Sequence, residues 1–433
     1  MSAAAWTAAR AALAARQAER LQALVARVTG GNAFYTQKLA AAGVDAAAVA
    51  RHGVTALPCT TKAELIADQD AHPPWGSAHT EPIGAYTRYH QTSSTTGRPL
   101  RWLDTNASWQ WALDCWKSVF AAARVQPGDR VLFAFSFGPF LGFWTAFEAG
   151  CQIGAHCVPG GGMTSHQRLA LIDAVRPGVL LCTPTYALRL AEVAEAERGH
   201  APLTASGVRT IIVAGETGGS VSAVRARIER AWGARVIDHY GLTEVGPVAF
   251  EDWDRPGGLY VNEAEFIAEV LDAQGAPVPD GELGELVLTN LGRTASPVIR
   301  YRTSDIVRAR TAPCPTGPAY LWLDGGILAR ADDMVTIRGV NVYPTAVDAV
   351  VHAHADVTEF RATVAHESAM RHLTVEIEVR PGADGAAIAE AVALGLKEAL
   401  GLTVAVRAVA ANALPRFEMK ARRFVMADAG SDA

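Results

Sequence analysis

The chain has 433 residues, and its 39 Lys and Arg against 44 Asp and Glu give a formal net charge of −5 at pH 7. This mild acidity provides no electrostatic surface for nucleic acid or an anionic membrane, so we expect neither as a partner. Hydrophobic residues make up 50% of the chain and charged residues 19%, which permits a large buried core and excludes extensive disorder. The length indicates two to three domains.

The six cysteines are dispersed and include no Cys-x-x-Cys pair. This pattern argues against a disulfide framework and a zinc ribbon, and it suits a reducing compartment. The N-terminal segment contains no apolar run of signal-peptide length, so the predicted location is the cytoplasm. Apolar residues then follow at the i, i+3, i+4, i+7 spacing of an amphipathic helix: Leu21, Leu24, Val25 and Val28.

Residues 131–150 are long enough to span a membrane and carry almost no charge. Gly138 and Pro139 interrupt this stretch in its middle, and Glu148 lies near its end. We therefore interpret it as a buried strand, a tight loop and a packed helix rather than a transmembrane helix.

Strands and helices alternate between residues 131 and 238. Apolar strand-like runs begin at residues 131, 153, 178, 208 and 234, and helical patterns lie between them. The last of these helices is predicted to end at Gly233, a residue typical of helix C-termini. Apolar strands that alternate with helices predict a parallel sheet covered on both faces, with ligands bound at the carboxyl ends of the strands.

Two changes of pattern follow the parallel region. Residues 258–310 contain strand-like runs joined by Gly and Pro turns, which predicts a smaller, mostly antiparallel unit. The remainder has the order helix, strand, strand, helix, strand, a compact α+β unit large enough to fold separately. The predicted fold class is α/β: a large N-terminal domain, residues 1–330, with parallel sheets flanked by helices plus a small β unit, and a small mobile C-terminal α+β domain, residues 331–433.

Residues 90–100, HQTSSTTGRPL, are the first segment with a chemical signature: four hydroxyl residues followed by a glycine, Ser93, Ser94, Thr95, Thr96 and Gly97. Hydroxyls and backbone N–H groups donate hydrogen bonds to phosphate oxygens, and glycine permits close approach of the backbone. The segment lacks the first glycine and the Lys-Ser/Thr pair of a P-loop. Taken alone, it is also typical of a polar surface turn.

Further motifs follow in order: AGET at residues 214–217, DHYGLTEVG at 238–246, YRTSD at 301–305, RADD at 330–333 with IRGVNVYP at 337–344, and PRFEMK at 415–420. Together with the hydroxyl-rich loop, this ordered set resembles the adenylate-forming superfamily. More narrowly, it resembles the phenylacetate–CoA ligase family of aryl-acid ligases. The resemblance extends over nearly the whole chain, from about residue 32 to residue 420.

The resemblance implies two half-reactions. A carboxylate attacks the α-phosphate of ATP to give an acyl adenylate and pyrophosphate, and a thiol, most simply that of coenzyme A, then displaces AMP. It therefore implies an acid–thiol ligase that uses ATP, Mg²⁺ and coenzyme A and acts on an aromatic carboxylic acid. Such chemistry depends chiefly on positioning and on neutralising developing charge.

The implied ATP site draws on several motifs. Asp305 would accept hydrogen bonds from the ribose hydroxyls, Tyr240 would stack on the adenine, and Arg330 would assist at the ribose or phosphate. The carboxylate of Glu244 would bind Mg²⁺ through oxygen. The implied ATP-binding residues are Ser93, Ser94, Thr95, Thr96, Gly97, Gly215, Glu216, Thr217, Asp238, His239, Tyr240, Gly241, Thr243, Asp305 and Arg330.

Lys420 and Glu244 are the implied catalytic residues. The ammonium of Lys420 would contact the attacking carboxylate and the α-phosphate, where negative charge accumulates in the transition state. Because Lys420 belongs to the small domain, the resemblance implies that this domain rotates between half-reactions about a hinge at Asp332. After rotation, Arg338 and Gly339 would line the path of the thiol, where a side chain in place of Gly339 would obstruct a pantetheine arm.

The acyl pocket is expected beside the adenylation centre. Aromatic residues next to glycines suit a flat, apolar slot for an aryl ring, and the expected walls are Phe137, Phe140, Phe143, Gly161, Gly162, Ala214 and Tyr240. His90 and Thr243 are candidate partners for polar ring substituents. The acid is left open among benzoate, phenylacetate, anthranilate and hydroxylated aminobenzoates.

Three positions depart from the family pattern without removing a reacting group. Ser304 stands where the ribose motif usually has Gly, Ala329 where the hinge motif usually has Gly, and Thr217 where Pro commonly follows Gly-Glu. Some relatives resemble zinc proteins after the DHYGLTEVG loop. Residues 250–260 here contain neither Cys nor His, and Cys314 has no such neighbour, so we expect no structural zinc.

Two alternatives remain open. The thiol could belong to an acyl carrier protein, which would make the chain an aryl-acid AMP ligase that loads a carrier in natural-product biosynthesis. The chain could also be a non-catalytic nucleotide-binding relative, although the joint presence of Lys420, Glu244 and Asp305 argues against a sensor. The sequence does not indicate the oligomeric state, and a homodimer is compatible with it.

Overall fold

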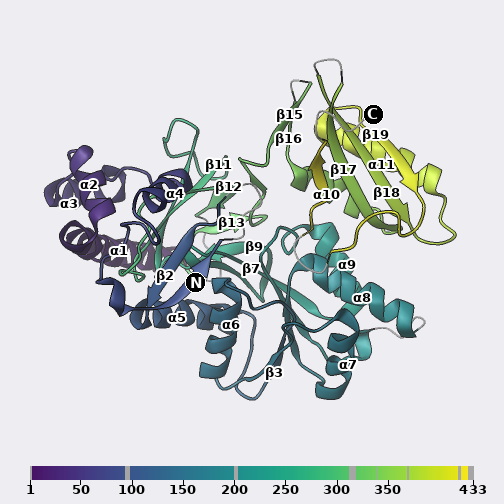
Figure 1. The fold of residues 1–433 in the computed structure, drawn as a ribbon, viewed down its shortest axis with the longest axis horizontal. Helices are drawn as coiled ribbons and strands as arrows, with labels where there is room; N and C mark the ends of the chain where they lie inside the picture. Colours follow the sequence, from purple (N-terminus) through teal and green to yellow (C-terminus); the bar gives the residue numbers. More distant parts are fainter. Residues whose placement is uncertain are drawn as a thin grey trace.

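The computed structural model describes residues 2–92, 98–198, 203–311, 318–338, 340–367, 370–417 and 421–427 (Figure 1). A larger N-terminal body is followed by a smaller C-terminal body, which lies beside helices α8 (Pro184–Arg198) and α9 (Ser222–Trp232) of the larger one. Among the described helices, none has the length and apolar composition needed to cross a membrane.

The N-terminal residues form a helical layer at one side of the larger body (Figure 1). Its core includes all four apolar residues expected on one helix face, which pack with Leu291 and Ile299 from the sheet region. The predicted amphipathic helix is therefore confirmed as α1. The layer comprises α1 (Ala3–Gly31), α2 (Ala33–Ala41), α3 (Ala46–His52), the 3₁₀ turn η1 (Gly53–Ala56) and α4 (Lys62–Ala71).

The alternating region forms the predicted parallel sheet. Its strands occur in the order β4-β3-β5-β6-β7, all parallel, and the helices between them cover the sheet. Gly233 ends α9 in the left-handed conformation, φ 62°, as predicted for a helix stop. The elements are β3 (Arg130–Phe133), α6 (Leu141–Gln152), β4 (His156–Pro159), α7 (Ser165–Val175), β5 (Val179–Cys182), α8, the 3₁₀ turn η3 (Leu203–Ala205), β6 (Thr210–Val213), α9 and β7 (Arg235–Leu242).

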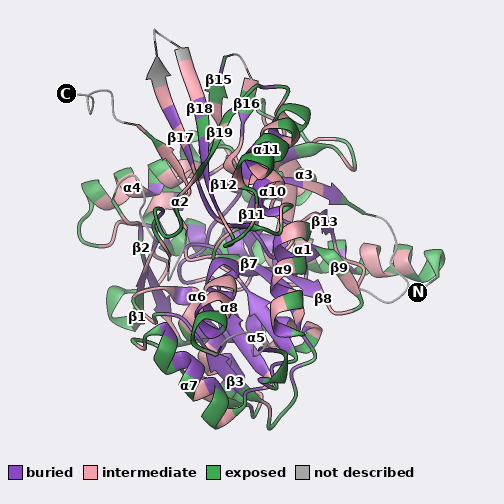
Figure 2. Ribbon diagram, turned by 90° about the vertical axis from the view of Figure 1, so that its right-hand side faces the viewer, coloured by how far each residue is buried: buried purple, intermediate pink, exposed green. Residues whose placement is uncertain are grey.

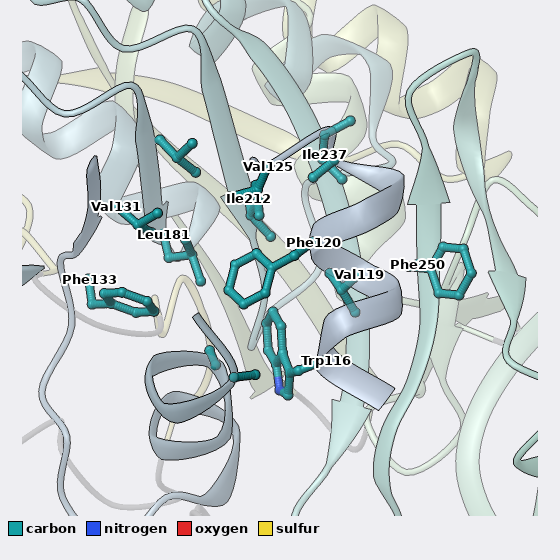
Figure 3. Close-up of a cluster of buried hydrophobic side chains, with 14 of the residues drawn as sticks. Trp116, Val119, Phe120, Val125, Val131, Phe133, Leu181, Ile212, Ile237 and Phe250 are labelled. Atoms are coloured by element: carbon teal, nitrogen blue, oxygen red, sulfur yellow. The ribbon is translucent and has the colours of Figure 1, made fainter. Parts of the chain in front are cut away.

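Residues 131–150 therefore form a strand, a loop and a helix, which confirms their interpretation. The β3 residues Val131 and Phe133 are fully buried against Phe120 of α5 (Asn106–Ala122) (Figure 3). Leu181, Ile212 and other strand residues complete this cluster. The apolar character of the stretch thus reflects burial in a protein core.

A short hairpin precedes α5, and it frames the hydroxyl-rich loop. Its strands are antiparallel, β1 (Tyr86–Gln91) and β2 (Arg101–Thr105), and the 3₁₀ turn η2 (Ile83–Ala85) leads into it. Beyond the paired residues, Thr92 and Leu100 exchange two hydrogen bonds of 3.0 Å, from Thr92 N–H to the Leu100 carbonyl and from Leu100 N–H to Thr92 Oγ1. The hairpin therefore holds the two ends of the predicted phosphate loop close together.

The antiparallel strands differ from the prediction in one respect. They are antiparallel as expected, but they continue the same sheet in the order β10-β11-β12-β13-β9-β8-β7 instead of forming a separate small unit. The connection is the β7–β8 hairpin, whose pairing a linear pattern does not reveal. These strands are β8 (Gly246–Asp252), β9 (Arg255–Val261), β10 (Phe266–Leu271), β11 (Leu283–Asn290), β12 (Tyr301–Arg310), β13 (Trp322–Asp324) and β14 (Ala329–Arg330).

The smaller body is the predicted α+β unit with its own core. A sheet of order β19-β18-β17-β20 packs against α10 and α11 around residues such as Val351, Val375 and Leu396. Figure 2 shows buried residues along the strands of both bodies and exposed residues on the outer helix faces. The elements are β15 (Val335–Ile337), β16 (Val340–Val342), α10 (Pro344–His352), β17 (Val357–Glu367), β18 (Met370–Val379), α11 (Gly385–Leu400), β19 (Ala405–Val409) and β20 (Phe424–Met426).

Candidate active site

Most of the predicted site segments lie at one edge of the sheet. Residues 134–140 follow β3, residues 160–162 follow β4, residues 214–217 follow β6, and residues 238–242 form the end of β7. Because these strands belong to one parallel array, in which β5 lies between β3 and β6, their carboxyl ends share one edge, as predicted. The antiparallel strand β12 adds Asp305, and β14 places Arg330 directly opposite it in the strand pairing.

Asp305 is bound by two predicted site residues. Its side chain is buried, and Oδ2 accepts a hydrogen bond of 2.5 Å from the phenol of Tyr240. The other oxygen, Oδ1, accepts a hydrogen bond of 3.0 Å from Nη1 of Arg330. The structure therefore brings Tyr240, Asp305 and Arg330 together, although they come from three different sequence motifs.

The environment of this group determines its protonation. Burial raises the pKa of Asp305 to about 6, against the opposing effect of the Arg330 guanidinium. Burial, together with the Asp305 carboxylate, raises the pKa of Tyr240 well above its usual value, so the phenol is the donor. Burial alone would lower the pKa of Arg330, but hydrogen bonding to Asp332 and the nearby carboxylates raise it overall.

Asp332, the predicted hinge residue, is tied to this network. It is exposed, and its two carboxylate oxygens accept hydrogen bonds from Nε and Nη2 of Arg330 at 2.9 and 2.8 Å. Ser304, on the other side of Asp305, has φ 63°, a left-handed conformation that favours glycine. The serine that departs from the family pattern therefore keeps a glycine-like backbone.

Glu244 is buried beside β12, and its Oε1 accepts a hydrogen bond of 2.7 Å from the phenol of Tyr301. Burial and the Glu244 carboxylate raise the pKa of Tyr301 well above its usual value, which keeps the phenol protonated. Within the described ranges, no cluster of three or more His, Cys, Asp or Glu could hold a metal ion. A single carboxylate still fits Mg²⁺ in a nucleotide site, because this ion takes most of its ligands from phosphates and water.

Asp104 and Arg293 were not predicted as site residues. Both are fully buried, and Arg293 binds the carboxylate of Asp104 through Nε at 2.8 Å and Nη2 at 2.6 Å. Its remaining Nη1 donates a hydrogen bond of 2.7 Å to the carbonyl of Thr243. This ion pair thereby connects β2 to the turn that carries Glu244, and isolated Asp and Arg residues give no sequence signal for such a link.

Asp238 and His239 are buried in β7 and make contacts within the protein. Ser220 donates a hydrogen bond of 2.6 Å to Asp238, and burial raises the pKa of this carboxyl to about 7. Nδ1 of His239 lies 2.8 Å from the carbonyl of Ala249, its ring packs on Trp116, and burial lowers its pKa to about 4. A direct role of either side chain in nucleotide binding stays a prediction.

The loop after β6 links the two bodies. Gly215 has φ 93°, and Thr217, like Gly215, is exposed. Between them, Glu216 accepts a hydrogen bond of 2.7 Å from the backbone N–H of Thr185 on α8. Its second oxygen accepts one of 3.1 Å from the backbone N–H of Ala421, in the smaller body. The segment directly after Lys420 is therefore bound to the larger body.

Three of the aromatic residues predicted for the acyl pocket, Phe137, Phe140 and Phe143, belong to one cluster, whereas Tyr240 binds Asp305 instead. The rings of Phe140 and Phe143 are in edge contact, with centroids 6.2 Å apart. Gly161 packs so closely on Phe137 that an added Cβ atom would lie 2.8 Å from its ring. Gly162 has φ 75°. Three members of the cluster were not predicted, although the spacing of aromatics in residues 133–147 hints at them: Phe135, Trp144 and Phe147.

The polar candidates for the acyl pocket differ in character. His90 is buried and stacks on Trp109 with ring centroids 5.1 Å apart, and burial lowers its pKa to about 4, so its ring is neutral. Its Nδ1 has no hydrogen-bond partner among the described residues. The other polar candidate, Thr243, follows β7 and is partly exposed. Two further predicted residues are apolar or lack a side chain: Gly241, at the end of β7, is exposed, and Ala214, after β6, is partly exposed.

Several predicted residues lie outside the described parts of the chain, namely Cys314, Gly339, Lys420 and the loop residues Ser93, Ser94, Thr95, Thr96 and Gly97. Arg338, next to Gly339, has φ 48°, and its Nη2 donates a hydrogen bond of 2.5 Å to the carbonyl of Thr403. This contact lies within the smaller body, so the thiol-path role of Arg338 stays a prediction.

Residues 85–293 match the family model of AMP-binding enzymes, and residues 339–427 match that of the AMP-binding enzyme C-terminal domain. The phenylacetate–coenzyme A ligase of Thermus thermophilus is 34% identical over 373 residues, which cover 85% of this chain and 81% of that protein. The phenylacetate–coenzyme A ligase of Escherichia coli is 30% identical over 426 residues, 95% of this chain and 94% of its own.

The chain belongs to the phenylacetate–CoA ligase family. The resemblance inferred from the ordered motifs is therefore confirmed, as is the α/β fold with a C-terminal α+β domain. The members of this family are acid–thiol ligases. In this chain the family's motifs supply the hydrogen-bonded group of Tyr240, Asp305 and Arg330 and the buried Glu244.

A solved ligase structure shows which arrangement of the two bodies is present. This phenylacetate–CoA ligase-like chain superposes on 2-hydroxyisobutyryl-CoA ligase in the postadenylation state, in complex with R3-HIB-AMP, with a TM-score of 0.89 and 29% identity over 95% of this chain and 89% of that one. The structure of the same ligase in its thioesterification state superposes less well, with a TM-score of 0.72 over 98% of this chain and 90% of that one. The bodies are therefore arranged as in the postadenylation state of that enzyme.

Proposed function

We propose that the protein activates an aromatic carboxylic acid with ATP to an acyl adenylate and then transfers the acyl group to coenzyme A, releasing pyrophosphate and AMP. The observation that carries this proposal is the network of Tyr240, Asp305 and Arg330 beside the buried Glu244. The relatives named above, which share most of the chain, are coenzyme A ligases that act on an aryl acid, phenylacetate.

The nucleotide is proposed to bind along the carboxyl edge of the sheet. Asp305 accepts hydrogen bonds from the ribose hydroxyls through lone pairs left free by Tyr240 and Arg330, and the ring of Tyr240 borders the adenine. Ser93, Ser94, Thr95, Thr96 and Gly97 surround the β- and γ-phosphates. The hairpin contact between Thr92 and Leu100 keeps the ends of that loop together.

Glu244 is proposed as the protein ligand of Mg²⁺, which would neutralise phosphate charge during the attack on the α-phosphate. Tyr301 holds one oxygen of this carboxylate, and the Asp104–Arg293 pair holds the turn through Thr243. These contacts limit the motion of the carboxylate, so the binding geometry is preorganised before ATP enters.

Lys420 is proposed to place its ammonium between the attacking carboxylate and the α-phosphate. There the ammonium would stabilise the negative charge that develops in the transition state more strongly than the charge of the ground state. We propose domain boundaries of residues 1–330 and 331–433, since Arg330 is the last residue paired with β12. Rotation about Asp332 would then replace Lys420 by Arg338 and Gly339 at the thiol path.

The aryl ring is proposed to lie against the aromatic cluster of residues 135–147, opposite Gly161 and Gly162. Both walls are largely apolar, and the ring of Phe137 packs closely against Gly161. The buried, neutral His90, whose Nδ1 has no hydrogen-bond partner among the described residues, is the candidate for a polar substituent. A flat acid with few polar substituents therefore suits the pocket best.

Coenzyme A is proposed as the thiol in preference to a carrier protein, because the relatives matched over most of the chain are coenzyme A ligases. The cytoplasm is proposed as the location, where ATP and coenzyme A are available. The thiols of Cys59, Cys115, Cys151, Cys157 and Cys182 are free, which suits a reducing compartment.

The direct test is a panel of aryl acids incubated with ATP, Mg²⁺ and the purified protein, with and without coenzyme A. Acid-dependent pyrophosphate release, with an acyl-CoA product that appears only when coenzyme A is present, would support the proposal. Release of pyrophosphate with no acyl-CoA for any acid would favour a carrier protein as acceptor. Binding of ATP without any pyrophosphate release would favour a non-catalytic relative.

A further inference from the structure

Two residues of the smaller body contact the larger one where the loop after β6 meets the N-terminal end of α8. The backbone N–H of Ala421 donates to Oε2 of Glu216 at 3.1 Å, and Nη1 of Arg423 lies 3.4 Å from Oγ1 of Thr185. Thr185 in turn donates its own N–H to Oε1 of Glu216 at 2.7 Å. Glu216 and Thr185 therefore form a joint docking point for residues 421–423.

The helix end explains why a carboxylate is suited to this position. The N–H groups of the first helical turn have no partners within the helix, and the helix dipole favours negative charge there. Thr183 already binds the N–H of Tyr186 at 3.2 Å, so Glu216 takes up the next free donor, Thr185 N–H. The carboxylate is held from one side and presents its second oxygen to Ala421.

Residues 421–426 are also fixed within the smaller body. The guanidinium of Arg423 binds both oxygens of Glu359, with the longer contact at 3.0 Å. The carbonyl of Arg423 accepts a hydrogen bond of 2.7 Å from Ala362, and β20 then pairs in parallel with β17. Glu216 thus connects a segment that is hydrogen-bonded within the smaller body to a helix of the larger one.

We infer that Glu216 is a positioning residue, which docks the segment beginning at Ala421 against α8 and thereby places the adjacent Lys420 for adenylation. This inference rests on the proposed function, because it assigns Lys420 a part in the first half-reaction. It changes the expected role of Glu216, from a nucleotide contact to a contact between domains. In the rotated arrangement this contact would be absent, so Glu216 should matter for one half-reaction only.

Glu216→Gln tests the inference with little change of shape. Thr185 N–H and Ala421 N–H bind different oxygens of Glu216, and glutamine replaces one of these oxygens by an NH₂ group that cannot accept, so in this geometry one of the two donors loses its partner. At saturating ATP, the rate of acid-dependent exchange between pyrophosphate and ATP should fall about tenfold, equivalent to about 1.4 kcal/mol, with little change in KM for ATP. Transfer from supplied acyl adenylate to coenzyme A should stay within about twofold of wild type.

The matched control is Glu195→Gln, which lies on α8 itself. Glu195 contacts Arg380 of the smaller body at 3.4 Å through an exposed ion pair, far along the helix from its N-terminal end. This variant removes one negative charge, as Glu216→Gln does, but leaves the hydrogen bond to Ala421 intact. Both half-reactions should keep wild-type rates, because exposed ion pairs contribute little.

Hydrogen exchange provides a measurement that needs no catalysis. Peptides that contain residues 421–426 should exchange about tenfold faster in Glu216→Gln than in the wild type, whereas Glu195→Gln should not change them. A rise in KM for ATP alone, with normal maximal exchange and unchanged protection, would overturn the inference in favour of a nucleotide contact. An equal fall of both half-reactions would overturn it in favour of a structural role. A wild type without adenylation would instead refute the proposed function, and the protection data would still decide whether Glu216 docks the segment.

Discussion

Tyr240 and Asp305 are 65 residues apart in the sequence, and the phenol of Tyr240 donates a hydrogen bond of 2.5 Å to the buried carboxylate of Asp305. The bond joins the end of β7 to β12, across the change from parallel to antiparallel strands. It holds one oxygen of the carboxylate that we propose for ribose binding, while Arg330 holds the other. The orientation of Asp305 is therefore determined by the protein before any nucleotide binds.

The pH dependence of adenylation should report on Asp305. Its pKa is about 6, raised by burial, so the carboxylate is ionised above pH 6 and becomes protonated below it. A protonated carboxyl loses acceptor capacity for the ribose hydroxyls, so kcat/KM for ATP should fall about tenfold per pH unit below about 6. The measurement is pyrophosphate exchange from pH 5 to 9.

Asp332→Asn identifies the titrating group. The charge of Asp332 contributes to the raised pKa of Asp305, and its removal also takes away one carboxylate that competes with Asp305 for Arg330. Both effects lower the pKa of Asp305, so the acid limb should move to lower pH. A limb that stays in place or moves to higher pH would assign the titration to another group.

Glu244→Gln should raise the Mg²⁺ concentration needed for half-maximal adenylation and slow the reaction, since it removes an anionic oxygen ligand at nearly constant shape. Tyr301→Phe removes only the hydroxyl, which donates a hydrogen bond of 2.7 Å to Glu244. Loss of one hydrogen bond to a charged group corresponds to about 1.5–3 kcal/mol, so we expect roughly a tenfold or larger loss in this variant, again most marked at limiting Mg²⁺. Unchanged Mg²⁺ dependence in Glu244→Gln would place this residue away from the metal.

Ser304 should tolerate glycine and reject a β-branched residue. Its φ of 63° is strained for residues with a Cβ atom. Ser304→Val should lower the free energy of unfolding by about 1–2 kcal/mol, whereas Ser304→Gly should leave it unchanged or raise it slightly. Denaturant unfolding of the three proteins measures this, and equal stabilities would show that the backbone here relaxes without cost.

Asp332→Pro should separate the two half-reactions. Proline fixes φ near −65° and removes a backbone N–H, which restricts rotation of the smaller domain. If the variant is held in the arrangement seen here, adenylate should still form, whereas transfer to coenzyme A should fall at least about tenfold. Asp332→Asn, measured at pH 8, removes the carboxylate without the proline and should retain both steps. Equal retention by Asp332→Pro would place the hinge elsewhere.

Local patterns predicted the strands and helices well, because period and turn residues act over short distances. The run from residue 131 to Gly233 is an example: each predicted strand and helix is present, and Gly233 ends α9 as expected. The continuation of this sheet into the antiparallel strands was missed, since it depends on the β7–β8 register. The short strand β20 was missed as well, because only its pairing with β17 defines it.

The site was predictable where a motif carried it. Tyr240, Glu244, Asp305 and Arg330 come from ordered motifs, and the fold brings their strands and turns together. The Asp104–Arg293 pair was not predictable, because its members are 189 residues apart and neither lies in a motif. The docking role inferred for Glu216 was also hidden, since its partner is a backbone N–H of Ala421.

The most direct test of the proposed chemistry compares the wild type with Lys420→Ala in acid-dependent exchange between pyrophosphate and ATP. The wild type should exchange label only when a suitable aryl acid is present. Lys420→Ala should bind ATP normally but exchange roughly 10²–10³-fold more slowly, about 3–4 kcal/mol, because its ammonium acts chiefly on the transition state. Exchange in the mutant at a rate near that of the wild type would contradict the assignment of Lys420 and the adenylation mechanism built on it.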